Sequence, residues 1–362
     1  MIIDVVLGLA GGKGGLENVL TSITQALHKK GHDVRLFQMM PSPYKEWENS
    51  IPKVFYYDYA RNHFGKMYKD EIEPYRYALG YRTLLDTIGV PDVILATHTP
   101  LFSLVTHLAT GYLGQKRPPI ISWIHGPTEA YGGGLLLKFA DAHFAITESV
   151  KDDIKRSLPA PAPVFTVGNP VKVSNVPLIP RPDDILKLIY IGRIDNKQKR
   201  LDVLFHALSL LHGTWELHLF GEGTDEQMLK ELAIKLGISN HLIWFGWRDN
   251  PWDNVNSASL LVLSSDYEGF GLVIVEALAR GVPVIATNCE GPKDIIQNGI
   301  NGWLYPVGDS SRLAETLQNI IKNIVQLPDA KVCVETVQHF HIDGVIERME
   351  QAILTTKAFY NP

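Results

Sequence analysis

The sequence predicts an α/β protein with two doubly wound, Rossmann-like domains in tandem. In both halves of the 362-residue chain, short β-branched runs alternate with longer segments whose apolar residues recur at helical spacing. Between the halves, residues 157–184 contain seven prolines in 28 positions, which excludes a continuous helix and predicts an interdomain connection with one short strand. We expect domains at residues 1–170 and 171–344, with facing loops that form one cleft.

Five strands are expected in each half. In the first half they cover residues 2–9, 33–39, 92–97, 119–125 and 142–147, and in the second half residues 186–193, 215–223, 241–247, 258–265 and 283–287. The first helix follows a glycine-rich loop and ends at Gly31, a typical C-terminal cap. In doubly wound sheets ligands bind beyond the carboxyl ends of the strands, so the loops at those ends are the candidate sites.

Composition excludes several classes of protein. The net charge of −5, without a stripe of Lys and Arg, argues against nucleic-acid binding. Two cysteines, Cys289 and Cys333, make a disulfide framework implausible and indicate a reducing compartment. The sequence has no apolar run of the roughly 18 residues that a membrane span needs. The N-terminus has no basic region before its apolar run, which Asp4 interrupts, so we expect a core strand, not a signal peptide, and a cytoplasmic protein.

The first candidate loop contains Gly11, Gly12, Gly14 and Gly15 before a helix. Glycines let backbone amides approach a ligand, and a helix N-terminus favours phosphate. A dinucleotide site would also need a carboxylate about 20 residues further on, at the end of the second strand, and that strand ends in Met39 and Met40 instead. The alternative is a tight turn that binds no ligand.

The second candidate loop contains two cations, Arg193 and Lys199, six residues apart and just before a helix. They are well placed to hold a diphosphate, and arginine can bind two oxygens at once. The alternative is a solvated charge run, because Lys197 and Arg200 stand in the same stretch.

The third candidate loop contains two glutamates, Glu268 and Glu276, eight positions apart. We expect Glu268 at a strand end, and Glu276 two turns into the following helix, among apolar residues. A buried carboxylate needs hydrogen-bond donors, and a ribose offers two adjacent hydroxyls. The alternative partner of Glu276 is a neighbouring backbone group or an arginine. Gly269 and Gly271 allow close backbone approach to a phosphate.

These motifs together resemble retaining glycosyltransferases of family four, which have the GT-B fold. The resemblance covers nearly the whole chain and is specific because the motifs occur in order. They are GGKGG, WIHG, ITESVKDDI, VGNPV, YIGR followed by QKRLDVL, FGEG, and DYEGFGLVIVEALARGVPVIATNCEGPKDII. The resemblance also implies that the C-terminal helix, residues 345–362, crosses back onto the first domain.

The resemblance implies a role for each matching residue in binding a UDP-sugar donor. Arg193 and Lys199 would neutralise the diphosphate, and Glu276 would bind the ribose hydroxyls. Glu268 would hold the transferred sugar, together with backbone amides near Phe270, Gly271 and Leu272.

Further matches place the rest of the donor and the acceptor. His125 would lie beside the sugar, and Gly14 and Gly15 near the phosphates and the acceptor. Trp247 and Arg248 would lie near the base, and Gly221 belongs to the turn that lines the nucleotide. No D-x-D carboxylate pair follows a suitable strand, so we expect no metal and no other cofactor, with cations and a helix dipole stabilising the leaving group.

The implied activity is transfer of a hexose, galactose or glucose, to a glycan or lipid-linked acceptor in bacterial envelope polysaccharide synthesis. Two departures concern the acceptor side and subfamily: Gly126-Pro127 follows His125, and GPKDII offers Asp294 where the family often has glutamate. The Gly-Pro-basic-acidic order of GPKDII resembles that of lipopolysaccharide α-galactosyltransferases. The rival functions are a sugar-nucleotide 2-epimerase and a catalytically silent partner that binds nucleotide-sugar or glycan.

Two other features are assigned no site. His98, His107 and His143 fit no zinc spacing and are expected to be loop or core histidines. The basic and aromatic segment 59–82 predicts either weak contact with an anionic membrane surface, which would make the protein peripheral at the inner face of the cell membrane, or a solvated helical face. Its acidic residues favour the solvated face.

Overall fold

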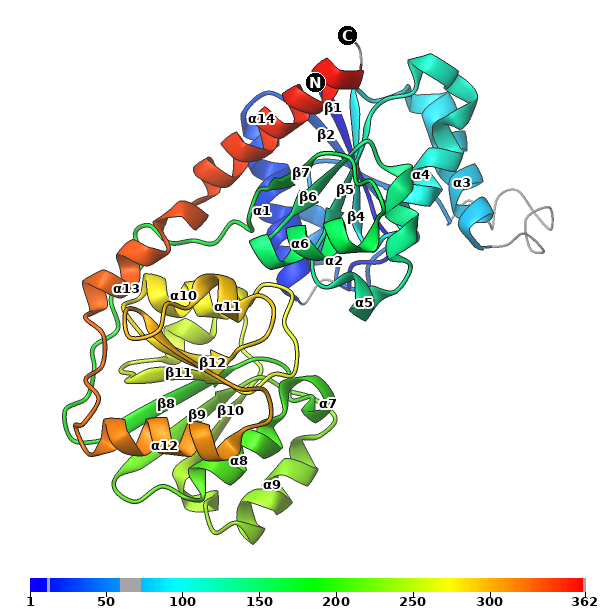
Figure 1. The fold of residues 1–362 in the computed structure, drawn as a ribbon. Coiled ribbons are helices and arrows are strands. Elements are labelled where there is room, and N and C mark those ends of the chain that lie inside the picture. Colours follow the sequence, from blue (N-terminus) through cyan, green and yellow to red (C-terminus); the bar gives the residue numbers. More distant parts are fainter. Residues whose placement is uncertain (12–13, 59–72, 361–362) are drawn as a thin grey trace. The chain divides into compact units, whose positions relative to one another are not determined.

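The computed structural model describes residues 1–11, 14–58 and 73–360. The chain divides into two compact units. The N-terminal unit comprises residues 1–170 and 342–362, and the C-terminal unit comprises residues 171–341. Each unit contains one sheet whose described strands all pair in parallel (Figure 1).

The sheet of the N-terminal unit has the strand order β3-β2-β1-β4-β5-β6-β7. Its strands are β1 (Ile2–Val6), β2 (Asp33–Gln38), β3 (Val54–Tyr56), β4 (Val93–His98), β5 (Ile120–Ile124), β6 (Ala142–Ala145) and β7 (Val164–Thr166). Its helices are α1 (Gly15–Lys29), α2 (Lys45–Asn49), α3 (Glu73–Ile88), α4 (Leu101–Thr110), α5 (Thr128–Tyr131), α6 (Glu148–Ser157) and α14 (Ile342–Tyr360). The order reverses between β1 and β4, so a ligand crevice is expected beyond their carboxyl ends.

The sheet of the C-terminal unit has the order β10-β9-β8-β11-β12-β13 and reverses between β8 and β11. Its strands are β8 (Leu186–Ile191), β9 (Trp215–Phe220), β10 (Leu242–Gly246), β11 (Leu260–Leu263), β12 (Val284–Thr287) and β13 (Gly302–Tyr305). Its helices are α7 (Asn196–Lys199), α8 (Leu201–Leu208), α9 (Glu226–Lys235), α10 (Leu272–Ala279), α11 (Pro292–Ile295), α12 (Ser310–Ile321) and α13 (Ala330–Thr336).

The predicted fold class is confirmed, because both units contain doubly wound parallel sheets. The sequence did not predict β3, which has three residues, or β13, which begins with glycine, a residue that is depleted in strands. The short strand expected in the proline-rich connection is β7, which pairs with β6. The facing of the two domains across a cleft stays a prediction.

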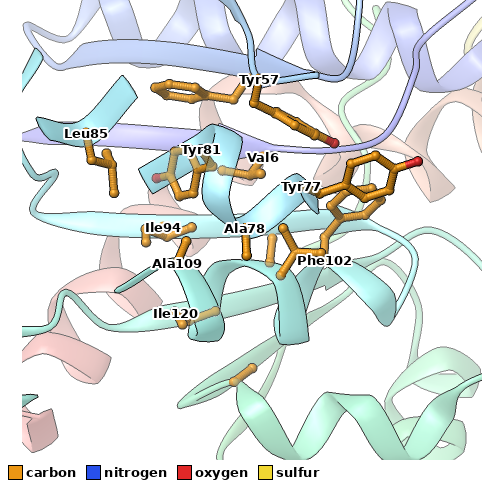
Figure 2. Close-up of a cluster of buried hydrophobic side chains, with 14 residues drawn as sticks. Val6, Tyr57, Tyr77, Ala78, Tyr81, Leu85, Ile94, Phe102, Ala109 and Ile120 are labelled. Atoms are coloured by element: carbon orange, nitrogen blue, oxygen red, sulfur yellow. The ribbon is translucent and has the colours of Figure 1, made fainter. Parts of the chain in front are cut away.

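The core of the N-terminal unit holds β1 and β4 in place. Aromatic and aliphatic side chains from β1, β2, β4, α3 and α4 form one buried cluster (Figure 2). Asp4, the carboxylate inside the first strand, accepts hydrogen bonds from Arg35 Nε at 2.6 Å and from the Tyr81 hydroxyl at 2.7 Å. Burial raises its pKa to about 6 despite both partners. Tyr57 donates to the carbonyl of Leu7 at 2.7 Å, which anchors the chain as it leaves β1.

Helix α14 packs against α1 within the N-terminal unit. Its Glu350 pairs with Lys30 and, at 2.8 Å, with His32, while Lys357 pairs with Asp92 at 3.1 Å. Arg348 donates to the carbonyl of Val167 at 3.0 Å. The helix begins at Ile342, three residues before the expected start.

The segment 59–82, for which membrane contact was one expectation, is only partly described. Residues 59–72 lie outside the described residues, and residues 73–82 form the first part of α3. Of the helices within the described ranges, none has both the length and the hydropathy needed to cross a bilayer.

Candidate functional site

The reversal of strand order between β8 and β11 brings two candidate loops together. Leu260 and Leu261 of β11 pair directly with Leu188 and Ile189 of β8. The segments that leave the carboxyl ends of these neighbours, residues 192–200 and 264–271, therefore start side by side. This is the position at which open α/β sheets bind ligands.

The turn after β8 is built on close backbone contacts. Gly192 donates to the carbonyl of Phe220 at 3.0 Å, and Gly221 donates to that of Gly246 at 2.9 Å. Gly221 has φ +143°, and a Cβ there would lie 1.8 Å from the carbonyl oxygen of Gly192. Only glycine fits at position 221. Its close contact with Gly192 sets the path of the chain toward Arg193, the next residue.

Arg193 has a fixed backbone and an exposed side chain. The buried Tyr190 hydroxyl donates to the Arg193 carbonyl at 2.7 Å. The side chain is 70% exposed, donates to Gln198 Oε1 at 2.6 Å and lies 3.8 Å from the carboxylate of Asp195. Gln198 in turn donates to the carbonyl of Tyr267 at 3.1 Å. The Arg193 cation is therefore exposed to solvent, while the Tyr190 hydrogen bond anchors its backbone.

Lys199 forms an ion pair with Glu268 at 2.6 Å, and the two side chains are 13% and 10% exposed. Lys199 is the last residue of α7, and Glu268 lies in the loop after β11. The alternative of a solvated charge run is therefore wrong for Lys199. Arg200 is also paired, with Asp202 at 3.0 Å and Asp266 at 3.1 Å, whereas Lys197 is exposed.

Hydrogen bonds to backbone carbonyls connect the two loops around this pair. Ser264 Oγ donates to the carbonyl of Lys199 at 2.8 Å, and the amide of Asp266 donates to the carbonyl of Gln198 at 2.9 Å. These bonds, with the Arg200–Asp266 pair, hold the loops in register. The sequence identified the two charges but not Gln198, Ser264 or Asp266, because their pairing depends on strand order.

Glu268 has a second donor on the same oxygen as Lys199. Ser265 Oγ donates to Glu268 Oε1 at 2.7 Å, and Thr287 Oγ1 donates to the carbonyl of Ser265 at 2.6 Å. Both hydrogen bonds to this buried carboxylate are at Oε1, and within the described ranges no donor to Oε2 is seen. Oε2 is therefore the oxygen with which Glu268 can accept from a ligand.

The N-terminus of α10 follows this carboxylate. Gly271 caps the helix with φ +85°, and Leu272 is the first helical residue. Phe270 is buried and packs edge-on against Phe340, with ring centroids 5.1 Å apart. The first amides of a helix have no acceptor within it and carry a partial positive charge, so they favour an anionic or oxygen-rich ligand.

Glu276 is half-buried, not fully buried, and is the fifth residue of α10, little more than one turn from its start. The expectations of full burial and of a position two turns in are corrected. Its Oε2 accepts from the indole of Trp252 at 2.8 Å, a donor that was not expected from the sequence. Arg280 donates to the Glu276 carbonyl at 2.9 Å and lies over the Trp252 ring, 4.8 Å from its centroid. The Trp252 bond fixes one carboxylate oxygen and orients the other.

Trp247 and Arg248 follow β10, the edge strand two positions from β8. The Trp247 side chain is 38% exposed, and Arg248 is exposed and donates to the Trp247 carbonyl at 2.9 Å. Both residues follow the carboxyl end of their strand, as the Lys199–Glu268 pair does, but β9 lies between β10 and β8 in the sheet.

The glycine loop of the N-terminal unit has a carboxylate beside it. Gly14 caps α1 and Gly15 begins it, while Gly12 lies outside the described residues. A Cβ at Gly14 would lie 2.7 Å from Oε2 of Glu17, which is buried in the first turn. A negative charge there disfavours phosphate, so the loop is a weaker phosphate site than its glycines alone suggest.

His125 follows β5 and is half-buried. Its Nε2 lies 3.1 Å from Thr97 Oγ1, and its ring centroid lies 4.5 Å from that of Trp123. Burial, with a smaller effect from His98, lowers the pKa of His125 to about 3. The ring is therefore neutral at pH 7, with one nitrogen that donates a hydrogen bond and one that accepts.

The three other histidines considered as metal ligands lie in the N-terminal unit, and His107 is part of α4, with its ring centroid 5.1 Å from that of Phe139. His98 ends β4 with φ +78° and contacts the Tyr131 ring, 5.3 Å between centroids. His143 is fully buried and shares a 2.7 Å hydrogen bond with Ser122 Oγ. Across the described ranges, no three His, Cys, Asp or Glu side chains are grouped as a metal site.

Comparison with known proteins identifies both halves of the chain. Residues 13–175 match the family described as glycosyltransferase family 4, and residues 178–337 match glycosyl transferases group 1. The chain is 32% identical to a lipopolysaccharide 1,6-galactosyltransferase of Salmonella typhimurium over 68% of this chain and 67% of the relative. It is 30% identical to the Escherichia coli lipopolysaccharide 1,6-galactosyltransferase over 66% and 68%.

Solved structures agree on the fold. The apo structure of the lipopolysaccharide outer core galactosyltransferase WaaB superposes with a TM-score of 0.86 at 25% identity, over 98% of this chain and 99% of that chain. HepE of Anabaena, crystallised with UDP and glucose, superposes with a TM-score of 0.78 at 18% identity, over 98% and 100%.

Proposed function

Because this chain belongs to glycosyltransferase family four, with the GT-B fold, we propose that it is a retaining hexosyltransferase. It transfers galactose, or else glucose, from a UDP-sugar to a glycan or glycolipid acceptor in cell-envelope polysaccharide synthesis. The observation that supports this most is the Lys199–Glu268 pair at the strand reversal of the C-terminal unit. The relatives named as galactosyltransferases favour galactose as the sugar.

The donor is held by residues of the C-terminal unit. Arg193 and Lys199 neutralise the diphosphate, and the first amides of α10 add their partial charge. Glu276 accepts from the ribose hydroxyls with the oxygen that Trp252 leaves open. The uracil lies near Trp247 and Arg248, beyond the Gly221 turn.

The transferred sugar lies by Glu268 and the backbone from Phe270 to Leu272, with His125 accepting or donating a neutral hydrogen bond. Gly14 and Gly15 border the acceptor. A lipid-linked acceptor would place the enzyme at the inner face of the cell membrane as a peripheral protein. No metal is assigned a role, because two cations and a helix N-terminus supply the positive potential that the leaving group requires.

The reaction is a front-face substitution. The bond from the anomeric carbon to the acceptor oxygen forms as the bond to the β-phosphate oxygen breaks, and UDP leaves with the electron pair. The acceptor proton passes to the departing phosphate. Attack by Glu268 is the less favoured variant, because Oε1 already accepts from Lys199 and Ser265, and donors to a carboxylate stabilise its charge.

Turnover of UDP-sugars tests the proposal against its rivals. The chain is incubated with UDP-galactose, UDP-glucose or UDP-N-acetylglucosamine, with and without truncated lipopolysaccharide, and UDP release is measured. Acceptor-dependent release from a UDP-hexose is expected. Binding without any release would indicate a silent partner, and epimerised sugar nucleotide without acceptor would indicate an epimerase; either result would replace the proposal.

Removal of the Glu276 carboxylate is expected to weaken UDP binding. Glu276→Ala removes a charge-assisted hydrogen bond to the ribose, which costs about 1–3 kcal/mol. Calorimetric titration of UDP checks it. The matched control is Glu315→Ala, which removes an exposed carboxylate from α12 in the same unit. Unchanged UDP affinity in a folded Glu276→Ala protein would remove Glu276 from the ribose site.

Chelation is expected to leave activity in place. Arg193 and Lys199 provide the positive charge beside the diphosphate, so UDP release in EDTA should match the untreated rate. The assay is repeated after addition of manganese to the chelated enzyme. Complete loss in EDTA, recovered with manganese, would show that a divalent cation is required.

A further inference from the structure

The hydroxyl of Thr97 lies between a backbone carbonyl and the ring of His125. Thr97 is fully buried in β4, opposite Trp123 of the neighbouring β5. Its Oγ1 is 3.0 Å from the Trp123 carbonyl oxygen, to which it donates, and 3.1 Å from His125 Nε2. Register between the two strands sets both distances.

Only one hydrogen is available for these two contacts of the Thr97 hydroxyl. A threonine hydroxyl has one hydrogen and two lone pairs, and a carbonyl can only accept. The hydroxyl hydrogen therefore goes to the Trp123 carbonyl, and Oγ1 offers only a lone pair to the ring. If the hydrogen pointed to Nε2 instead, two oxygens would face each other at 3.0 Å without a hydrogen between them.

We infer that Thr97 is a positioning residue that fixes His125 as the Nε2–H tautomer, leaving Nδ1 as a bare acceptor. A hydrogen bond to one ring nitrogen commonly determines which nitrogen carries the proton. Because burial keeps the ring neutral at pH 7, Nδ1 does not become a donor.

The inference rests on the proposed function only for its consequence. If His125 lies by the sugar with Nδ1 toward it, Nδ1 selects a group that donates, which in a carbohydrate is a free hydroxyl. An ether oxygen, a carbonyl or a fluorine at the same position would face a lone pair and be rejected. His125 thus recognises a hydroxyl by accepting from it, and Thr97 makes it do so.

The tautomer can be measured without any substrate. The protein is labelled with ¹⁵N-histidine, and long-range ¹H–¹⁵N spectra at pH 7 give the shifts of both ring nitrogens; the His125→Gln spectrum assigns the signal. We expect the wild type and Thr97→Ser to show Nε2–H. Thr97→Val removes the hydroxyl and should shift His125 toward a mixture or toward Nδ1–H. A wild-type Nδ1–H tautomer would overturn the inference, even if Thr97→Val failed to fold.

Kinetics provide the second measurement. Thr97→Val is expected to lower kcat about tenfold, the lower end of the loss seen when the hydrogen-bond partner of a metal-ligating histidine is removed. The KM for UDP-sugar should stay nearly unchanged, and Thr97→Ser should be close to wild type. The matched control is Thr106→Val, another fully buried threonine of this unit, whose hydroxyl lies within hydrogen-bond distance of two carbonyls of its own helix, those of Phe102 and Ser103.

The two measurements separate the inference from the proposed function. An equal loss in Thr97→Val and Thr106→Val would contradict a specific role for Thr97. A wild type that shows Nε2–H but turns over no UDP-sugar would leave the tautomer assignment standing and remove the proposed function.

Discussion

Replacement of Lys199 by methionine is expected to lower turnover by about two to three orders of magnitude, the loss seen when one preorganised group that stabilises developing charge is removed. The variant loses the cation beside the leaving diphosphate. It also leaves Glu268, which is buried, with Ser265 as its remaining donor among the described residues. We expect a stability loss of about 1–3 kcal/mol from that incomplete pairing.

Two further variants separate charge from folding. Lys199→Met combined with Glu268→Gln removes the buried negative charge and should recover stability in thermal unfolding without recovering turnover. Lys197→Met is the matched control, because Lys197 is exposed on the same short helix. If Lys197→Met and Lys199→Met lost activity equally, the effect would belong to the general charge of α7 and the assignment of Lys199 would fail.

Replacement of Gly221 by alanine is expected to disrupt the donor site through its backbone. The added Cβ would lie 1.8 Å from the Gly192 carbonyl, at a φ of +143° that side chains rarely adopt. Overpacking and backbone strain of this kind cost about 3 kcal/mol together. The chain must move where it leads into Arg193, so UDP affinity should fall along with the free energy of unfolding.

The control for Gly221 is another glycine with positive φ in the same unit. Gly237 has φ +71°, and a Cβ added there would meet no other described residue within 4 Å, so Gly237→Ala carries the strain of the backbone without a collision. Its stability loss should be about 1–2 kcal/mol, with UDP affinity unchanged. Equal effects of the two substitutions on UDP affinity would mean that the Gly192–Gly221 contact does not shape the donor site.

The fold was predictable from the sequence because short β-branched runs alternate with longer segments of helical spacing in both halves. The strands Val54–Tyr56 and Gly302–Tyr305 were missed: the first has only three residues, and the second begins with glycine, which is depleted in strands. The proline-rich connection was predictable from composition, since prolines exclude a helix wherever they cluster.

The charges of the candidate site were also predictable, but their partners were not. Lys199 and Glu268 are 69 positions apart, and they meet because β8 and β11 are neighbours in the sheet. The Trp252 donor to Glu276 comes from a separate 3-10 helix, Pro251–Asn254, and the Thr97 contact with His125 depends on the register of β4 with β5. A single sequence specifies which residues can donate or accept, whereas strand order and register determine which of them meet.

The most direct test of the donor site is a crystal structure of the wild-type protein with UDP-galactose or UDP. We expect diphosphate oxygens within hydrogen-bond distance of Arg193 and Lys199, and ribose hydroxyls within hydrogen-bond distance of Glu276. A nucleotide bound instead at the loop of Gly11 to Gly15, with Lys199 still paired to Glu268 and no phosphate nearby, would contradict it.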